Sequence, residues 1–546
     1  MNLPLPRWVL GVLAVVALAV GVDNLRRPLA NPDEGRYAEI SREMVASGDW
    51  VTPRLNGVKY FEKPPLQYWA TAVALKLFGE NEIAARLYVA LCGLATILIL
   101  GFTGWRMYGA DAGLASVLVL ASSPYFMALG GILTLDMGLT LWTTATLCAL
   151  LLAEQAVASP REHRRWMLIA WAAMALAVLS KGLVGIVFAG AAVFFAMALR
   201  RDWRVLRRLE SGRGFAIFAI IAIPWFIAVS RSNPEFARFF FVHEHFERFL
   251  TTSHRRVQPA WFFIPILFAG FLPWMFALPA AIMHAWRSES GLLFKPLRIS
   301  LLWSAFILAF FSASGSKLPA YILPLFPSLA LVIGRYLVEA PPRRLAAWTG
   351  LAVPVTLGLL VVTWYFPQWD RDTWNRALSV EARPWAIAAA AIFLVATVGS
   401  TLLLARARRW AGIVLLAFAL TATLDCLLRA YAAYLPRQSG FEMAQEMKPY
   451  LKPATRVYNV SQYDQTLPFY IGRTTTLVDY QDEFETGLKA EPGLTIAAIE
   501  KFPEAWLREG DALAIMQPGA YEKFKAAGLP MQVLHEDPRR VLVRKP

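Results

Sequence analysis

The sequence predicts an all-α polytopic membrane protein that carries a C-terminal soluble α/β domain, and three observations lead to this fold class. First, 57% of the 546 residues are hydrophobic, 17% are charged, and the mean hydropathy is +0.45, which is too apolar for a soluble globule of this length. Second, apolar runs long enough to cross a bilayer recur through residues 1–435. Third, from Pro436 onward short strand-like and helical runs alternate, as in a small α/β domain.

The apolar runs define about thirteen transmembrane helices within the predicted membrane domain, residues 1–435. A stretch that resembles a small-residue cleavage site, residues 17–19, lies inside the first run rather than after it, so we interpret that run as an uncleaved span. The predicted spans are residues 8–22, 83–104, 112–130, 136–156, 166–180, 183–199, 214–230, 260–283, 299–313, 318–338, 346–364, 384–404 and 411–433.

Basic residues in the short connections predict how these spans are oriented. Alternate connections carry the arginines, which the positive-inside rule assigns to the cytoplasm. With a cytoplasmic N-terminus and an odd number of spans, the loops 23–82 and 231–259 and the C-terminal domain, residues 436–546, fall on the outer, periplasmic face. The arginine-bearing connections are residues 105–111, 160–166, 200–213, 284–298, 341–344 and 406–410.

The net charge of +15 belongs to the membrane part of the chain. From Pro436 to the end, 14 Lys and Arg stand against 15 Asp and Glu. The excess charge therefore sets topology and can attract anionic lipid phosphates, and it does not indicate nucleic-acid binding. Cys92, Cys148 and Cys426 all fall in apolar runs, which predicts buried thiols and no disulfide framework.

The first outer segment, residues 31–69, mixes charged and aromatic residues between two apolar spans. One helix is predicted to begin at Asp33 and to end at Gly48, and a second follows Pro65. Short helices with an apolar face and a charged face lie in the membrane interface. The second outer segment predicts a similar helix over residues 234–250. Three polar regions thus converge on one face, where we expect the functional site.

Three carboxylates in or beside the membrane are candidates for chemistry. Asp33 and Glu34 form an adjacent pair at the mouth of the expected cavity, where a carboxylate orients or deprotonates an acceptor. A helix cap is an equally weighted interpretation of Asp33. Asp136 lies between apolar spans, where a lone carboxylate costs roughly 2.5 to 3.5 kcal/mol at mid-helix. A functional role is favoured there, with a helix cap at the interface as the alternative.

Four cations project from the outer side, where the positive-inside rule does not require them: Lys63, Lys181, Arg248 and Lys317. Lysine and arginine supply both charge and hydrogen-bond donors to a phosphate, so these residues suit a lipid-linked phosphate. Snorkelling of a long side chain to the interface explains any single one of them. Four together favour a phosphate site.

His243 and His245, with Glu244 and Glu247, are a weak indication of a metal site. Two histidines two residues apart on a helix point in different directions, and Glu244 to Arg248 has the spacing of an ordinary ion pair. The sequence has no P-loop, no dinucleotide-binding glycine pattern and no second Asp-rich cluster for a nucleotide-bound metal. A nucleotide-sugar donor is therefore disfavoured.

Five stretches of the sequence resemble a known family: DEGRYAEISREM, GDWVTPRLNGVKYFEKPPLQYW, LDMGLTLW, SKGLVG and SKLPAYILPLFP. They are similar to the lipid A aminoarabinose transferases, GT-C glycosyltransferases of the bacterial inner membrane that are distantly related to protein O-mannosyltransferases. The resemblance covers the whole chain, and the YFEKPP motif at residues 60–65 is quite specific. It implies the GT-C fold, a polyprenyl phosphate-linked sugar donor and no required cofactor.

The resemblance also implies roles for single residues. The catalytic acids of the family correspond to Asp33 and Asp136, and Glu62 with His243 matches a pair that can hold a zinc ion of doubtful catalytic meaning. The resemblance further implies lipid-phosphate contacts at Lys63, Lys181 and Arg248, to which we add Lys317. It implies sugar or cavity contacts at Tyr37, Tyr60 and Glu62, to which we add Glu34, Arg36 and Tyr321.

The function expected from this resemblance is transfer of aminoarabinose from undecaprenyl phosphate to a lipid A phosphate, with inversion, on the periplasmic side. Such an enzyme modifies lipopolysaccharide and confers resistance to polymyxin and cationic antimicrobial peptides, and we expect it to act as a monomer. One alternative keeps the chemistry and changes the acceptor to a protein hydroxyl. Another is a lipid or sugar transporter, because charges within the membrane also mark transport routes. The sequence shows no evident internal repeat, which disfavours the transporter.

Overall fold

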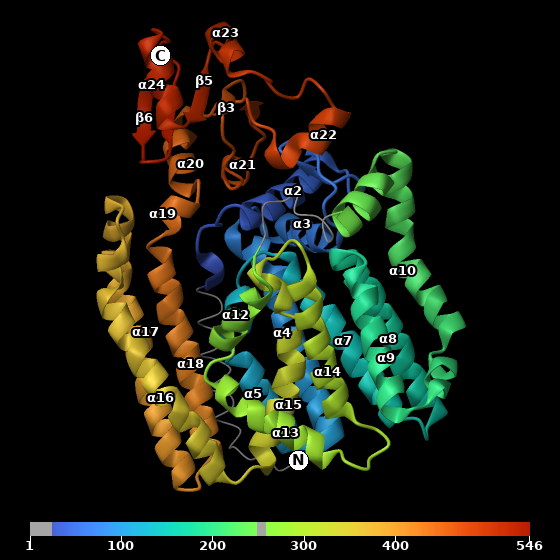
Figure 1. The fold of residues 1–546 in the computed structure, drawn as a ribbon. Coiled ribbons are helices and arrows are strands. Elements are labelled where there is room, and N and C mark those ends of the chain that lie inside the picture. Colours follow the sequence, from blue (N-terminus) through green and yellow to red (C-terminus); the bar gives the residue numbers. More distant parts are fainter. Residues whose placement is uncertain (1–23, 248–257) are drawn as a thin grey trace.

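The computed structural model describes residues 24–247 and 258–546, apart from the side chains of residues 243 and 245–247. A tall bundle of helices forms the lower part of the molecule, and a small α/β domain sits on one end of it (Figure 1). The predicted fold class, a polytopic helical membrane domain followed by an α/β domain, is confirmed. The first predicted span, residues 8–22, lies outside the described residues.

The bundle helices follow the predicted spans closely, but several of those spans are broken. The helices are α4 (Glu82–Tyr108), α5 (Ala110–Ala121), α6 (Pro124–Leu129), α7 (Leu135–Gln155), α8 (Pro160–Lys181), α9 (Val184–Arg200), α10 (Ser211–Ser232), α12 (Phe263–Gly270), α13 (Leu278–Ser288), α14 (Pro296–Ala313), α15 (Leu325–Glu339), α16 (Pro342–Tyr365), α17 (Thr373–Ala405) and α18 (Arg409–Ala432).

Two of the predicted spans divide where a proline follows a helix end. The span over 112–130 becomes α5 and α6, with Pro124 in the first turn of α6. The span over 260–283 bends by 107° between Gly270 and Trp274, where Pro273 lies. Within the described residues, seven helices are long and apolar enough to cross a membrane, or up to eight spans if the bent pair is one. The count of about thirteen therefore stays a prediction.

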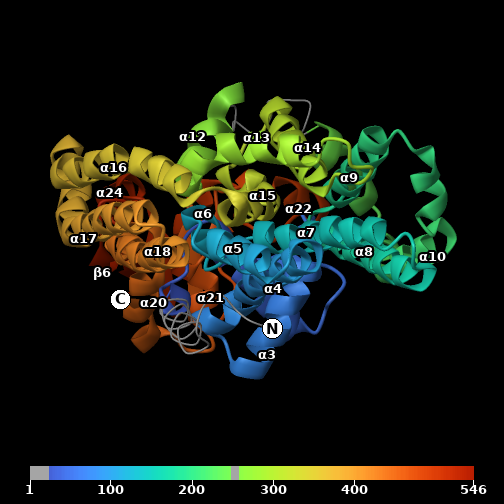
Figure 2. The ribbon, with the colours of Figure 1, turned by 90° about the horizontal axis from the view of Figure 1, so that it is seen from below.

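Seen from its lower end, the bundle has three groups of helices (Figure 2). Helices α16 to α18 form one side, α8 to α10 form the other, and α4, α5, α7 and α15 lie between them. Small residues allow close approach at the centre: a Cβ on Gly334 of α15 would lie 2.3 Å from the Ser116 Oγ of α5.

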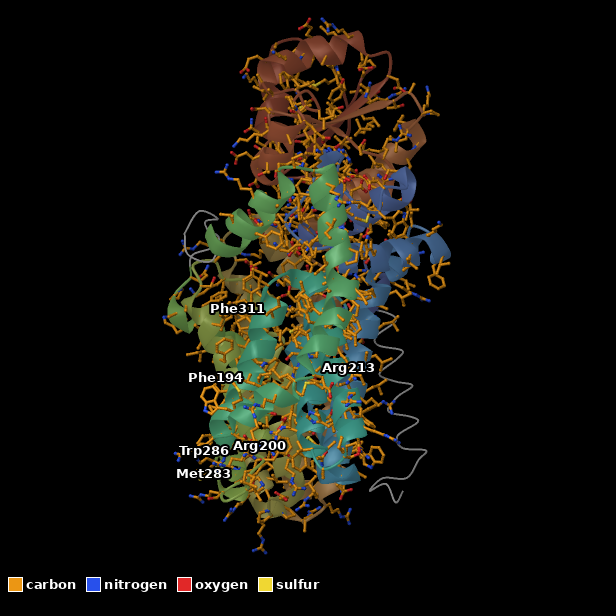
Figure 3. The ribbon with its side chains drawn as sticks, turned by 90° about the vertical axis from the view of Figure 1, so that its right-hand side faces the viewer. Phe194, Arg200, Arg213, Met283, Trp286 and Phe311 are labelled. Carbon is orange, nitrogen blue, oxygen red and sulfur yellow. The ribbon has the colours of Figure 1, made fainter. Side chains whose placement is uncertain are left out.

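The arginine-rich connections meet at the end of the bundle away from the α/β domain. Arg106 lies 2.5 Å from Glu162, and Arg164 lies 3.0 Å from Glu210. Figure 3 shows Arg200 and Trp286 toward this lower end. The structure thus brings together the connections that the charge pattern assigned to one face.

Two short helices and a hairpin lie between the bundle and the α/β domain (Figure 1). Helix α2 (Asp33–Ser47) and helix α3 (Leu66–Phe78) begin where the sequence predicts. Gly48 ends α2 with a φ of 73°, which glycine adopts without strain. Strands β1 (Arg54–Leu55) and β2 (Val58–Lys59) form a hairpin whose Asn56-Gly57 turn has positive φ at both residues.

The second outer segment forms a π-helix, η2 (Arg238–Glu247), after α10. The sequence predicts a helix over 234–250, and its last residues, 248–250, lie outside the described part. Phe236 and Phe240 of this segment stack with ring centroids 5.3 Å apart, and Phe236 meets Phe61 edge-on at 5.5 Å. The phenylalanines of the segment thus pack against the first outer segment.

The C-terminal domain is built on a five-stranded sheet in the order β4-β3-β5-β7-β6. The strands are β3 (Arg456–Val460), β4 (Thr476–Val478), β5 (Ala512–Met516), β6 (Gln532–Glu536) and β7 (Val541–Arg544), and the main helices are α20 (Phe441–Met447), α21 (Leu467–Ile471), α22 (Glu485–Ala490), α23 (Phe502–Arg508) and α24 (Pro518–Ala526). Strand β3 runs parallel to β4 and β5, and β7 is antiparallel to β5 and β6. Trp506 and Phe502 are fully buried in its core.

Candidate active site

Glu34, in the first turn of α2, is a fully buried carboxylate with many donors around it. Its Oε1 accepts from Nε of Arg86 at 2.8 Å and from the backbone N–H of Leu133 at 3.0 Å. Its Oε2 accepts from the N–H of Ala30 at 3.0 Å and from Nη1 of Arg27 at 3.1 Å. Burial alone would raise the pKa of Glu34, but the charges of Arg86 and Arg27 outweigh it and lower the pKa to about 2.

These contacts join the segment before α2, helix α4 and the connection between α6 and α7. Glu34 therefore acts as a structural carboxylate that fixes the start of α2 on the bundle. Both carboxylate oxygens of Glu34 already accept several hydrogen bonds, so they have little capacity to accept one from a sugar. The expected sugar contact of Glu34 stays a prediction.

Asp33 and Arg36, one turn apart on α2, begin a chain of charges that ends in the C-terminal domain. Nη1 of Arg36 donates to Oδ1 of Asp33 at 2.9 Å, and the Asp33 side chain is 40% exposed. Nε of Arg36 donates to Oε2 of Glu483 at 2.6 Å. No side-chain cap bond is made at the start of α2, so the cap interpretation of Asp33 finds no support in the described contacts.

Three tyrosines lie beside this chain. Tyr37 and Tyr68 have ring centroids 6.0 Å apart, and the guanidinium of Arg36 lies 5.9 Å from the Tyr60 ring centroid. Among the described residues, the buried hydroxyls of Tyr60 and Tyr68 have no hydrogen-bond partner. A buried hydroxyl without a partner is costly, and a ligand bound beside these two tyrosines would supply the missing bond. Tyr68 was not singled out from the sequence.

Burial raises the pKa of Tyr68 well above its usual range. The carboxylates of Glu62, Asp33 and Glu244 raise this pKa further, and the charge of Arg36 lowers it. Tyr68 therefore keeps its proton at neutral pH and lies within electrostatic range of all four charged groups.

Lys63 is held by two carboxylates. Its Nζ donates to Oε2 of Glu244 at 2.8 Å and lies 3.8 Å from Oε2 of Glu62. The Glu244 side chain is 2% exposed, whereas that of Glu62 is 24% exposed. The π-helix η2 thus brings its carboxylate to the first outer segment, and Lys63 stands between a buried acid and a more open one.

Asp136 and Lys181 form an ion pair deeper in the bundle. Asp136 is in the first turn of α7 and Lys181 in the last turn of α8, so an antiparallel helix pair places them together. The Lys181 Nζ also lies 4.4 Å from the ring centroid of Tyr321, a cation–π contact. The helix cap considered for Asp136 is not formed, because no side-chain cap bond is present at the start of α7.

Lys317 is buried in the connection after α14. Its Nζ donates to the carbonyl oxygen of Ser314 at 2.6 Å, and the residue is 7% exposed. Within the described residues no carboxylate lies within ion-pair distance of it. An ammonium in this setting retains donors for an anion.

Two predicted site residues cannot be placed. Arg248 and the side chain of His243 lie outside the described residues. Among the described residues, no three His, Cys, Asp or Glu side chains are placed to hold a metal ion. Zinc at Glu62 and His243 therefore stays a prediction.

The structure brings most of the described predicted residues into two clusters, and Glu34 and Lys317 belong to neither. The first contains Asp33, Arg36, Tyr37, Tyr60, Glu62 and Lys63, and the second contains Asp136, Lys181 and Tyr321. Sequence reasoning missed Arg27, Arg86, Tyr68 and Glu483. The charge of Arg86 in the first turns of an apolar helix was a signal that could have found it. No local signal marks Glu483, because it lies in the soluble domain among many other acids.

Known proteins resemble both the sequence and the fold. The family model described as "Aminoarabinose transferase C-terminal domain" matches residues 443–545, and the one described as "Dolichyl-phosphate-mannose-protein mannosyltransferase" matches residues 8–240. The crystal structure of ArnT from Cupriavidus metallidurans bound to undecaprenyl phosphate superposes with a TM-score of 0.93 at 35% identity, covering 99% of this chain and 98% of that one. This chain belongs to the aminoarabinose transferase family.

Curated members of the aminoarabinose transferase family agree with this placement. The chain is 36% identical over 349 residues to undecaprenyl phosphate-alpha-4-amino-4-deoxy-L-arabinose arabinosyl transferase 1 of Proteus mirabilis, covering 62% of this chain and 60% of the relative. It is 34% identical over 379 residues to the protein of the same name in Pseudomonas fluorescens, covering 66% of each. The aligned part of this chain thus spans about 60 to 66% of these two relatives.

A more distant likeness concerns the fold alone. The archaeal oligosaccharyltransferase AglB of Archaeoglobus fulgidus matches with a TM-score of 0.53 at 14% identity, covering 93% of this chain and 69% of that one. The match to the ArnT structure shows that the bundle has the GT-C fold, as the sequence motifs implied. The chain is a multi-pass protein of the inner membrane.

Proposed function

We propose that this protein transfers aminoarabinose from undecaprenyl phosphate to a phosphate of lipid A, with inversion, and so confers resistance to polymyxin and cationic antimicrobial peptides. The observation that carries the proposal is the match over 98% of an ArnT crystallised with undecaprenyl phosphate. The two clusters of acids and cations described above support it, because they supply the charges that this reaction needs.

The cations bind the donor phosphate. Lys63 and Lys181 each retain ammonium donors beyond their carboxylate partners, and Arg248 is expected to join them. As the bond between the anomeric carbon and the phosphate oxygen breaks, the leaving undecaprenyl phosphate takes the electron pair. Nearby cations stabilise this developing charge and so lower the barrier.

Asp33 orients the acceptor. A lipid A phosphate is already ionised near neutral pH, so it attacks the anomeric carbon from the opposite face without a strong base. Asp33 is exposed at the edge of the first cluster, where it can reach an incoming headgroup. Asp136 holds Lys181 and thereby shapes the second cluster.

The reaction takes place on the periplasmic face, and the protein acts as a monomer without a required metal. The collection of arginine-rich connections at the opposite end of the bundle supports this orientation. The C-terminal domain and helices α2 and α3 lie at the other end, which is then periplasmic.

Asp33→Asn tests the proposal. Lipid A from cells that carry the wild-type protein gains the mass of one aminoarabinose, whereas lipid A from Asp33→Asn cells does not, although the variant inserts and still binds undecaprenyl phosphate. A fully active variant would remove Asp33 from the mechanism. Wild-type cells whose lipid A gains no mass would refute the proposed function itself.

The match of residues 8–240 to a protein mannosyltransferase model favours one second candidate, transfer to a protein hydroxyl. A hydroxyl acceptor must be deprotonated, so Asp33 would act as a base and the rate would fall as pH drops through the pKa of that base. Sugar found on membrane proteins, with unmodified lipid A, would favour this candidate.

A further inference from the structure

The C-terminal domain packs directly on the turn of α2 that carries Asp33. A Cβ on Gly35 would lie 2.5 Å from both the carbonyl carbon of Gln465 and the nitrogen of Thr466. The N–H of Thr466 donates to Oδ1 of Asn31 at 3.1 Å. The first turn of α2 is therefore held by backbone of the domain as well as by the bundle.

Glu483 extends this contact into the first cluster. Nε of Arg36 donates to Oε2 of Glu483 at 2.6 Å, and Nη2 of Arg36 lies 2.5 Å from the same oxygen. Oε1 of Glu483 accepts from Nε2 of Gln465 at 2.8 Å. Both oxygens are thus bonded, and the Arg36 and Glu483 side chains are 9% and 7% exposed. A carboxylate fixed in this way holds the planar guanidinium in one orientation.

The other end of the same guanidinium reaches the proposed catalytic acid. Nη1 of Arg36 donates to Oδ1 of Asp33 at 2.9 Å. The charge of Arg36 is thereby shared between two carboxylates. Without the charge on Glu483, Arg36 would lose the carboxylate that holds its Nε and Nη2 groups. It would turn toward the remaining carboxylates that act on it, Asp33 and Glu62, and draw the Asp33 carboxylate away from the acceptor.

We infer that Glu483 is a positioning residue through which the C-terminal domain holds Arg36 and so sets the direction of the Asp33 carboxylate. The inference rests on the proposed function and gives the domain a part in the reaction.

Glu483→Gln tests this inference, with Glu491→Gln as a matched control. Glu491 pairs with Arg54 across the same interface, at 2.8 and 2.9 Å, without touching Arg36. We expect Glu483→Gln to lower kcat by up to about 100-fold with little change in the KM for the lipid-linked donor, because misdirected groups lose rate more than binding. Glu491→Gln should change either constant by less than about twofold, as partly exposed ion pairs contribute little.

A double-mutant cycle separates positioning from general support of the fold. If Glu483 acts only through Arg36, Glu483→Gln causes no further loss of kcat in an Arg36→Gln protein. Losses that multiply in the double variant would overturn the inference, as would equal effects of Glu483→Gln and Glu491→Gln.

Gln465→Leu covers the case in which Glu483→Gln does not fold. It removes the bond to Oε1 of Glu483 and leaves the charge in place, so kcat should fall in the same direction and to a smaller extent. Unchanged kcat in a folded Gln465→Leu protein would count against the inference. A wild-type protein that transfers no aminoarabinose to lipid A would instead refute the proposed function.

Discussion

Two neighbouring carboxylates at the start of α2 differ in solvent exposure and in the number of hydrogen bonds that they accept. The side chain of Asp33 is 40% exposed and shares one arginine, whereas that of Glu34 is 3% exposed and accepts from two arginines and two backbone N–H groups. Asp33 is thus available for chemistry, whereas Glu34 supports the fold. Helical geometry alone separates them, because successive residues point about 100° apart.

Glu34 should make the protein sensitive to acid. Its folded pKa of about 2 lies below its usual 4.5, so its stabilisation is complete above pH 4.5 and is lost as pH falls toward 2. About 2 kcal/mol of the free energy of unfolding should be lost by pH 3. Thermal unfolding in detergent from pH 6 to pH 3 measures this loss.

Glu34→Gln should lack this pH-dependent loss and should be less stable at pH 6 by about 3 to 5 kcal/mol, because two buried arginines lose their counter-charge. Equal acid sensitivity in the variant and the wild type would assign the loss to other groups.

Tyr60 should matter for the donor more than for the fold. Because its buried hydroxyl has no partner among the described residues, Tyr60→Phe should keep or slightly raise the melting temperature. The KM for the lipid-linked sugar should rise about tenfold through loss of one hydrogen bond. Donor kinetics and thermal unfolding on the same sample check both effects.

Tyr108→Phe is the matched control for Tyr60→Phe. The Tyr108 hydroxyl is also buried without a partner among the described residues, but it lies at the last turn of α4, where Arg335 contacts its ring at 4.9 Å. Its variant should leave the KM unchanged. A shift in KM equal to that of Tyr60→Phe would mean that the effect is not specific to the site.

At the scale of elements, the close approach of α2 to the C-terminal domain depends on a glycine. Gly35→Ala should push the helix from the Gln465–Thr466 backbone, at a cost of about 1 to 3 kcal/mol for overpacking. Because the displaced turn carries Asp33 and Arg36, kcat should fall as well. Thermal unfolding and single-turnover transfer measure the two effects.

Gly190→Ala provides the comparison for Gly35→Ala. A Cβ at Gly190, within α9, would meet nothing within 4 Å, and alanine favours the helix. Both stability and transfer should therefore be retained. A Gly35→Ala protein that behaves like Gly190→Ala would show that α2 and the domain adjust without cost.

At the scale of the whole molecule, cysteine labelling tests the proposed orientation of the protein in the membrane. The native cysteines are all buried, so an introduced cysteine reports its own side of the membrane. Lys525→Cys, on an exposed helix of the C-terminal domain, should react with a membrane-impermeant maleimide in intact spheroplasts. Arg204→Cys, in an arginine-rich connection, should react only after permeabilisation. The reverse pattern would contradict a periplasmic C-terminal domain.

The predictions that depended on local pattern agree with the structure. The strand-like and helical runs predicted after Pro436 form an α/β domain, and α2 begins at Asp33 and ends before Gly48 as predicted. For α3, the sequence predicted the helix but not its burial: Tyr68 is fully buried, whereas Val73 is 47% exposed. Periodicity identifies a helix, but the neighbours decide which face is covered.

The sequence by itself determined the membrane class, most helix positions, the charge asymmetry between the two ends and the α/β class of the terminal domain. Hydropathy, charge bias and turn chemistry act over short stretches of chain, so they can be read locally. Only the tertiary structure decided that Glu34 is a buried support, that Tyr68 faces the first cluster, and that Glu483 pairs with Arg36 across 447 positions of sequence. Partners of this kind are chosen by packing and by the cost of burying a charge, and neither is a property of the neighbouring residues.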